Sequence, residues 1–226
     1  EYDDVMNRQR QAIYGLRRQL LEQDDQREYM TSIANDIMTS LVRQHANEET
    51  HPSEWDLQGL HTSVLRQFGV DYQKEGIAPE EDELASDELN QRLGELVQQR
   101  YSEKEELIGT ESMRLHERML MLQIVDSQWK DHLLAMDHLK EGIGLRGYGQ
   151  RNPLIEYKKE SFELFEDLMD RIEDDTIRFL YLLQPMDQAR QADQMERRQK
   201  RQQFIASNQG KDDTTKKPVK RDSPKV

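Results

Sequence analysis

Apolar residues recur at helical spacing along the first 46 residues. This spacing is typical of a helix with one buried face. The apolar residues are Val5, Ala12, Leu16, Leu20, Met30, Ile33, Ile37 and Leu41. Residues 2–46 contain no proline and one glycine, and helix-favouring glutamine, arginine and glutamate occupy many of the other positions. The pattern predicts one continuous helix, roughly 60 Å long, that needs packing partners along its apolar stripe.

The pattern changes at residue 47. His51-Pro52 interrupts the helical spacing, and Pro79 and several glycines punctuate the residues that follow. Large apolar side chains in this stretch predict a small core, made of Trp55, Leu57, Leu60, Leu65 and Phe68. A further amphipathic helix is predicted from Ser86 to Tyr101, with Leu89, Leu93, Leu96 and Val97 on its apolar side. We therefore expect residues 47–108 to form a compact helical insertion.

The strongest periodicity lies in residues 110–144. Apolar side chains there step by three or four, at Leu115, Met119, Leu122, Val125, Trp129, Leu133, Met136, Leu139 and Ile143. Gly142, Gly144, Gly147 and Gly149 predict the end of this helix, and Pro153 suits the first turn of the next one. The second helix, 153–183, shows a heptad seam, at Phe162, Phe165, Met169, Ile172, Thr176, Phe179 and Leu183. The two helices predict an antiparallel hairpin with a glycine-rich loop of about nine residues.

Composition favours an all-α fold and sets the end of the chain apart. The sequence is 35% hydrophobic and 34% charged, which suits long helices with one buried stripe better than a thick sheet core. The net charge is −13, yet the residues from Gln184 onward hold eleven Lys or Arg against six Asp or Glu. We predict four parts: a long helix (1–46), a helical insertion (47–108), a two-helix hairpin (109–184) and a disordered basic tail (185–226).

The residues disfavour several kinds of chemistry. The chain has no cysteine, which rules out disulfides and thiolate zinc sites. The G-x-G-x-x-G pattern at 142–147 follows an amphipathic helix instead of a strand, so it does not predict nucleotide binding. His132 and His138 are six positions apart, where a helical zinc pair needs four. We assign no catalytic residue, cofactor or metal, and the acidic body disfavours nucleic acid as a partner.

The candidate functional residues are those at the tip of the predicted hairpin, Leu145, Arg146, Gly147 and Tyr148. A loop tip has no core to bury an aromatic ring, and tyrosine offers a flat contact surface at low entropic cost. Tyr148 beside the guanidinium of Arg146 therefore suits contact with a polypeptide. Because Glu1 starts the helical pattern without a methionine, we also expect the chain to be a piece of a longer polypeptide.

Several blocks of sequence together resemble the SecA family, the motor ATPases of bacterial preprotein translocation. The resemblance covers residues 1–183, and it is carried by Tyr2-Asp3-Asp4-Val5, Trp55-Asp56-Leu57, Asp126-Ser127-Gln128-Trp129-Lys130-Asp131-His132, Ile143-Gly144-Leu145-Arg146-Gly147-Tyr148 and Glu160-Ser161-Phe162. It implies that residues 1–46 are the scaffold long helix, 47–108 the helical wing domain and 109–184 the two-helix finger. The finger enters the cytoplasmic mouth of the SecY channel, and Tyr148 falls at the tip position that contacts the translocating chain.

The resemblance also implies partners. They are the SecY/SecE/SecG channel, the unfolded preprotein and the chain's own ATPase motor domains, with an anionic membrane surface and a second copy of the chain as further candidates. ATP and magnesium belong to motor domains outside this chain, so the chain alone is not expected to be an enzyme. The implied location is the bacterial cytoplasm and the cytoplasmic face of the inner membrane. The alternative is a free-standing helical adaptor or tethering protein with no ATPase partner.

Overall fold

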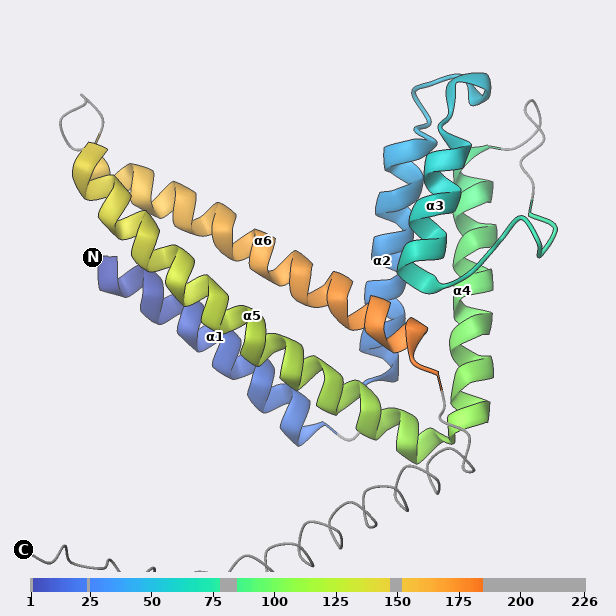
Figure 1. Ribbon diagram of the computed structural model, residues 1–226, viewed down its shortest axis with the longest axis horizontal. Coiled ribbons are helices and arrows are strands. Elements are labelled where there is room, and N and C mark those ends of the chain that lie inside the picture. Colours follow the sequence, from blue (N-terminus) through green and yellow to red (C-terminus); the bar gives the residue numbers. More distant parts are fainter. Residues whose placement is uncertain (1, 24, 78–84, 147–151, 185–226) are drawn as a thin grey trace, which may run out of the picture. The chain divides into compact units, whose positions relative to one another are not determined.

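The computed structural model describes residues 2–23, 25–77, 85–143 and 152–184, and the backbone alone of 144–146. These residues form six α-helices and one short 3-10 turn, with no strand among them (Figure 1). The elements are α1 (Tyr2–Glu22), α2 (Arg27–His45), η1 (Pro52–Glu54), α3 (Leu57–Phe68), α4 (Ser86–Ile108), α5 (Thr110–Arg146) and α6 (Pro153–Leu182). The prediction of an all-α fold is confirmed, and the predicted tail 185–226 lies outside the described residues.

The prediction of one continuous helix over 2–46 is wrong at its middle. Helix α1 ends at Glu22 and α2 begins at Arg27. Contacts from α5 hold the chain within this break, because Arg118 Nη2 donates to the carbonyl oxygen of Gln23 at 2.9 Å and Arg114 Nη1 donates to Asp25 at 2.8 Å. Local propensity alone favours a continuous helix, and these tertiary hydrogen bonds override it.

Helices α5 and α6 form the predicted antiparallel hairpin, and α1 lies alongside it (Figure 1). Helix α5 runs through Gly142 and Gly144 to Arg146, so the first two of the four predicted glycines do not end it; Gly147 and Gly149 lie outside the described residues. Two glycines cost about 1 kcal/mol each relative to alanine, which the long run of packed turns before them outweighs. Pro153 opens α6 as predicted, with the Asn152 side chain capping the backbone N–H of Leu154 at 3.0 Å.

Helices α2, α3 and α4 pack together at the end of the hairpin where α5 begins and α6 ends (Figure 1). Asp56 caps the start of α3 by accepting a hydrogen bond from the N–H of Gly59 at 2.8 Å. Gly69 ends the helix in the left-handed region, with φ +66°, where a side chain would be strained. Helix α4 continues to Ile108, further than predicted, and Gly109 separates it from α5.

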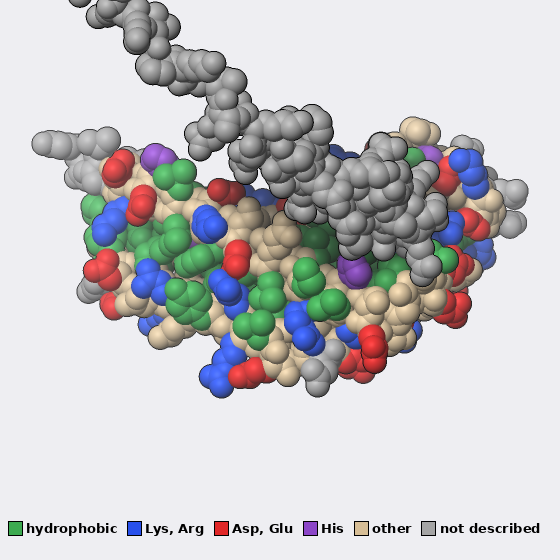
Figure 2. Space-filling model, turned by 60° about the horizontal axis from the view of Figure 1, so that its bottom comes forward, with side chains coloured by type: hydrophobic (Ala, Val, Ile, Leu, Met, Phe, Trp, Pro, Cys, Tyr) green, Lys and Arg blue, Asp and Glu red, His purple; other side chains and the backbone are tan. Residues whose placement is uncertain are grey.

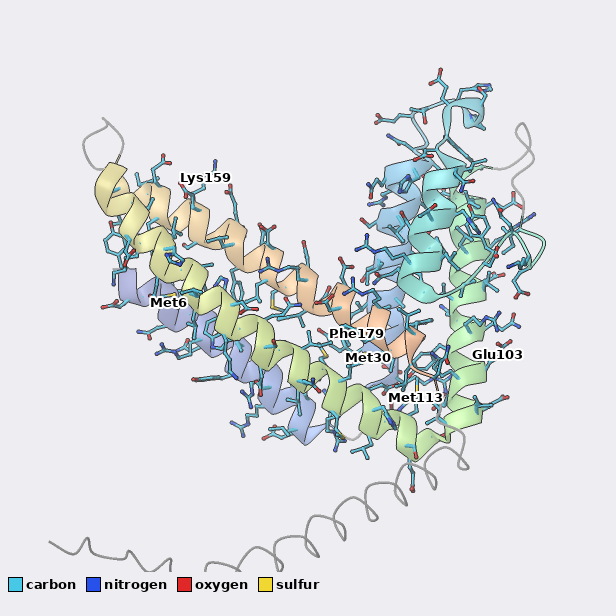
Figure 3. The ribbon with its side chains drawn as sticks, in the orientation of Figure 1. Met6, Met30, Glu103, Met113, Lys159 and Phe179 are labelled. Atoms are coloured by element: carbon cyan, nitrogen blue, oxygen red, sulfur yellow. The ribbon has the colours of Figure 1, made fainter. Side chains whose placement is uncertain are left out.

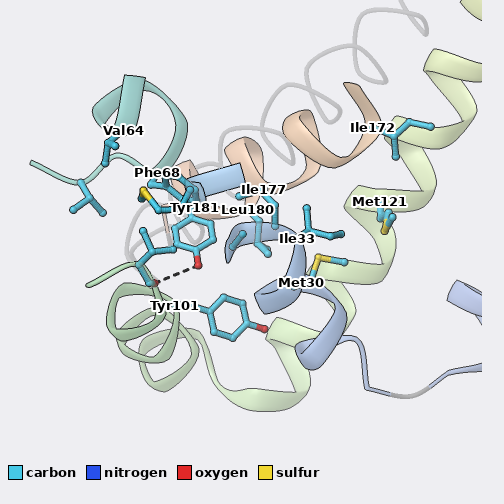
Figure 4. Packing of buried hydrophobic residues seen from close by; sticks show 14 of the residues in the cluster. Met30, Ile33, Val64, Phe68, Tyr101, Met121, Ile172, Ile177, Leu180 and Tyr181 are labelled. Atoms are coloured by element: carbon cyan, nitrogen blue, oxygen red, sulfur yellow. Dashed lines mark hydrogen bonds between the residues drawn. The ribbon is translucent and has the colours of Figure 1, made fainter. Parts of the chain in front are cut away.

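One large hydrophobic cluster joins side chains from every α-helix. Figure 4 shows its centre, where Tyr181 and Leu180 of α6 meet Phe68 of α3, Tyr101 of α4 and Met30 of α2. The phenol of Tyr181 donates to the carbonyl oxygen of Val97 at 3.2 Å. This cluster fixes the base of the hairpin against the helices around it.

The predicted apolar stripes differ from the buried ones at several positions. Exposed side chains include Leu65, Leu115, Met119, Phe162 and Phe179, all predicted to be core. In α6 the buried residues are instead Tyr157, Ser161, Leu168, Ile172, Thr176, Ile177, Leu180 and Tyr181. A heptad seam assumes a single partner helix, whereas α6 packs on α5, α1, α2 and α3 at different points along its length.

Candidate functional site

The end of α5 and the start of α6 lie far from the base formed by α2, α3 and α4 (Figure 1). Of the four predicted tip residues, Leu145 and Arg146 form the last turn of α5, where the backbone alone is described. Gly147 and Tyr148 lie outside the described residues. The described part of the site is therefore the pair of arms that carries the tip, together with α1, which supports them.

A buried ionic cluster centred on Arg114 holds the base of the hairpin. Arg114 lies 3.0 Å from Glu117 and 3.1 Å from Glu105, and it donates to the phenol oxygen of Tyr101 at 2.7 Å. The phenol in turn donates to Glu117, a fully buried carboxylate. Burial raises the pKa of the Glu117 carboxyl, and the hydrogen bond from Tyr101 and the charge of Arg114 act in the opposite direction. The cluster ties α4 to the first turns of α5.

Lys104 ties α4 to the other arm. Its ammonium donates to the backbone carbonyl oxygen of Leu180 at 3.1 Å and to that of Tyr181. These carbonyls belong to the last turn of α6, where a helix has acceptors without intrahelical donors and a negative dipole end. Burial is the main cause that lowers the pKa of the Lys104 amine, to about 8. Both arms of the hairpin are thus anchored on α4.

A buried polar layer crosses the middle of the three-helix part formed by α1, α5 and α6. The amide nitrogen of Gln9 donates to the carbonyl oxygen of Ser161 at 2.9 Å. The amide oxygen of Gln9 lies 3.0 Å from Nε2 of His132, which must therefore be the donor. Gln9 is 6% exposed, His132 1% and Ser161 0%, so these bonds are largely shielded from water.

The ring of His132 is packed between aromatic side chains. It stacks on Trp129 at 5.4 Å between ring centroids and meets Phe165 edge-on at 5.8 Å. Its Nδ1 has no hydrogen-bond partner among the described residues. Burial is the main cause that lowers the pKa of His132, to about 4, and the charge of Arg171 adds to it. His132 is neutral at physiological pH and acts as a hydrogen-bond donor.

This buried imidazole predicts a loss of stability in acid. Its pKa is lower in the folded chain than the unfolded value of about 6.5, so the unfolded chain takes up the proton first. His132 thus costs no stability above about pH 6.5, and roughly 3 kcal/mol of unfolding free energy is lost as the pH falls to about 4. Urea unfolding of His132→Gln across this range should show a flatter pH dependence than the parent chain.

The matched control for this measurement is His138→Gln, at an exposed position on the same helix. We expect it to leave the pH profile of stability unchanged. Parallel profiles for the parent chain and for His132→Gln would contradict the assignment of this acid sensitivity to His132.

An exposed apolar face follows the neighbouring helices α1 and α5. Its members are Tyr14 and Leu21 of α1 and Leu115 and Met119 of α5, each more than half exposed. Arg118, next to Met119, donates to the carbonyl oxygen of Gln23, which places the end of α1 against this part of α5. Figure 2 turns the α1 and α5 side of the molecule forward and shows hydrophobic side chains between charged ones. We name these four residues the α1–α5 face.

Side chains on the two sides of the hairpin have different surroundings. Figure 3 shows Lys159 pointing outward from α6, and Met30 and Met113 lying where α2 meets the first turns of α5.

No group of three or more metal-ligating side chains occurs among the described residues. In the same residues, no helix combines the length and the apolar character needed to cross a membrane.

Sequence reasoning missed both polar clusters. His132 was considered only as a metal ligand, although it stands three residues after Trp129 and four before Met136, inside the apolar stripe. A polar side chain at such a position signals a buried hydrogen bond. Gln9 gives a weaker signal, because its partners lie 123 and 152 residues away.

A long two-helix hairpin, anchored at its base and braced by a third helix, defines a helical scaffold. The model of the SecA wing and scaffold domain matches residues 1–184, and the chain belongs to this family. The chain is 50% identical over 190 residues to the protein translocase subunit SecA of Koribacter versatilis, covering 84% of this chain and 19% of the relative. It is 42% identical over 230 residues to that of Syntrophus aciditrophicus, covering 100% of this chain and 26% of the relative. The chain thus spans about a fifth to a quarter of these relatives' length.

Proposed function

We propose that this chain is the scaffold and wing part of a SecA-type motor that drives preproteins through the SecY channel. The family match over residues 1–184 carries this proposal, and the name of the relatives, protein translocase subunit SecA, supplies the process. The parts keep the bounds predicted from the sequence: a scaffold region (1–46), now two helices, α1 and α2, a wing domain (47–108), a two-helix finger (109–184) and a basic tail (185–226). The remaining three quarters or more of the relatives' length leaves room for the ATPase motor domains.

The hairpin acts as the finger that meets the translocating polypeptide. Its arms, α5 and α6, are 37 and 30 residues long, so the shorter arm spans roughly 45 Å. Both are anchored on α4, by Lys104 and by the cluster around Arg114. A lever with a fixed base and a short connecting segment delivers displacement to its tip, which is where Leu145, Arg146, Gly147 and Tyr148 lie in the sequence.

The motor domains dock on the α1–α5 face. Four large apolar side chains, each more than half exposed along two adjacent helices, form a surface that suits a partner domain. Motion in the motor domains then passes through α1 to the hairpin, and the hairpin in turn restrains ATP hydrolysis. Further partners are the SecY/SecE/SecG channel, an anionic membrane surface near the basic tail and a second copy of the chain. The protein works in the bacterial cytoplasm and at the cytoplasmic face of the inner membrane.

Truncation of the tip tyrosine tests this function. In a full-length SecA that carries this chain, Tyr148→Ala should reduce preprotein transport into channel-containing vesicles about tenfold or more while ATP turnover without preprotein stays within about twofold. Loss of one aromatic anchor in a contact surface typically costs 2 kcal/mol or more. Tyr148→Phe, which keeps the ring, should retain most of the transport.

The control for the tip is Ile155→Ala. Ile155 is a large side chain in the first turn of α6 and is 62% exposed, so its loss removes apolar surface close to the tip in sequence. We expect near-parental transport. Equal transport by Tyr148→Ala and by the parent protein would contradict the role proposed for the tip.

A further inference from the structure

Two hollows flank the first half of α1. A groove of about 430 Å³ lies between α1 and α6, with Gln9 and Ser161 in its lining. A second hollow of about 400 Å³ lies between α1 and α5 and is lined by Met6 and Met136 among others. The fit of α1 on the hairpin is therefore incomplete on both sides, and close packing alone does not hold its position.

The apolar contacts of α1 also involve two clusters, and Met6 packs against both of them. Met136, Ile143 and Tyr157 form a small cluster, with Tyr2 and Val5 of α1 packed against it. Ile13 and Leu20 of α1 belong to the large cluster instead. Gln9 lies between these two groups in the sequence of α1. Apolar packing has little directional preference, so a shift of α1 by one turn would exchange some apolar contacts for others of similar kind.

The polar layer makes such a shift costly. Gln9 bonds to α5 through His132 and to α6 through the backbone of Ser161. A shift of one turn moves the amide by about 5.4 Å, which breaks both bonds and leaves Gln9 and His132 buried without partners. Unsatisfied buried polar groups are strongly disfavoured. A single buried polar residue sets helix register in the same way in coiled coils.

We propose that Gln9 is a positioning residue that locks the register of α1 on the hairpin and so couples axial movement of α1 to movement of the finger. This coupling rests on the function proposed above. The hydrogen bond to the Ser161 carbonyl is central, because it joins α1 directly to the backbone of the α6 arm. With the lock in place, a displacement of α1 carries the hairpin with it. Without the lock, the polar contacts that remain include the partly exposed ion pair of Arg17 with Asp126 and the hydrogen bonds of Arg118 and Arg114 just beyond the end of α1, so α1 is held less firmly on the hairpin.

The test separates coupling from stability. Gln9→Met combined with His132→Phe replaces the polar layer by apolar side chains that fill similar space and keep an aromatic ring beside Trp129. Replacing a buried polar pair in this way is often neutral or stabilising. In a full-length SecA carrying this chain, we expect a melting temperature within about 5 °C of the parent. We also expect roughly fivefold less preprotein transported per ATP hydrolysed.

Disulfide cross-linking measures the register of α1 on the hairpin directly. Single cysteines replace Asp4, Arg8 or Ala12 of α1, each paired with Phe162→Cys on α6, and this chain has no cysteine of its own. Asp4 and Arg8 line the groove together with Phe162, and Ala12 stands one turn further on. In the protein with Gln9 and His132 in place, one of these cysteine pairs should form most of the disulfide. In the Gln9→Met, His132→Phe double variant, the disulfide should form at similar levels in neighbouring pairs.

The matched control is Gln11→Met, the same substitution at an exposed position of α1, which should change neither readout. A double variant that transports as much preprotein per ATP as the parent overturns the coupling role, provided that Tyr148→Ala impairs transport in the same assay. If Tyr148→Ala also leaves transport unchanged, the proposed function falls and the coupling role falls with it. An unchanged cross-linking pattern overturns the register lock by itself.

Discussion

Arg114→Met should lower the unfolding free energy of the chain by about 3–5 kcal/mol at neutral pH. The guanidinium lies within 3.1 Å of the carboxylates of both Glu105 and Glu117, which are almost completely buried. Methionine fills part of the space but leaves Glu117 without its cation, while Glu105 keeps only Arg27, at 3.3 Å. Urea titration followed by circular dichroism measures the loss.

Arg92→Met is the control for this measurement. Arg92 pairs with Glu88 four residues away on the same helix, and its side chain is half exposed, so we expect a loss below about 1 kcal/mol. Adding Glu117→Gln to Arg114→Met should recover part of the stability, since it removes a buried charge and keeps an acceptor for the Tyr101 hydroxyl. Equal losses for Arg114→Met and Arg92→Met would contradict the structural role of the cluster.

Aspartate at two positions of the α1–α5 face should weaken binding of this chain to a separately prepared SecA ATPase core by more than tenfold. Leu115→Asp and Met119→Asp place charges where Leu115 is 52% and Met119 61% exposed in the chain alone. Burying an unpaired carboxylate against apolar surface is costly, and tenfold corresponds to about 1.4 kcal/mol. Titration of the labelled core with the chain, with ATP turnover followed in parallel, gives both affinity and restraint of hydrolysis.

Leu134→Asp is the matched control for docking. Leu134 is on the same helix and is 59% exposed, but it lies roughly 22 Å further along the axis than Met119. It should bind the core like the parent chain. If the parent chain neither binds the core nor slows its hydrolysis, the alternative of a helical adaptor without an ATPase partner gains support.

Local patterns determined the helices well and their ends less well. The periodicity of apolar residues and the proline at 153 are local signals, and they place α5, α6 and the hairpin correctly. The break between Glu22 and Arg27 and the continuation of α5 through Gly142 have no such signal. Contacts of Arg114 and Arg118 with residues more than 80 positions away decide the first, and packing along the arms decides the second.

The residues of the candidate site could also be predicted only in part from the sequence. The tip, Leu145 to Tyr148, was found from the glycine-rich sequence between two amphipathic helices and from its family resemblance, and its assigned role stays a proposal. The sequence by itself determined that the chain is all-helical, that it carries a hairpin and that it belongs with SecA. Both the periodicity and the matching sequence blocks depend only on residues that are close together in the sequence. Only the tertiary structure decided which polar side chains are buried together. Gln9, His132 and Ser161, like Arg114 and Glu117, acquire their roles from desolvation, and desolvation depends on which distant helices exclude water from them.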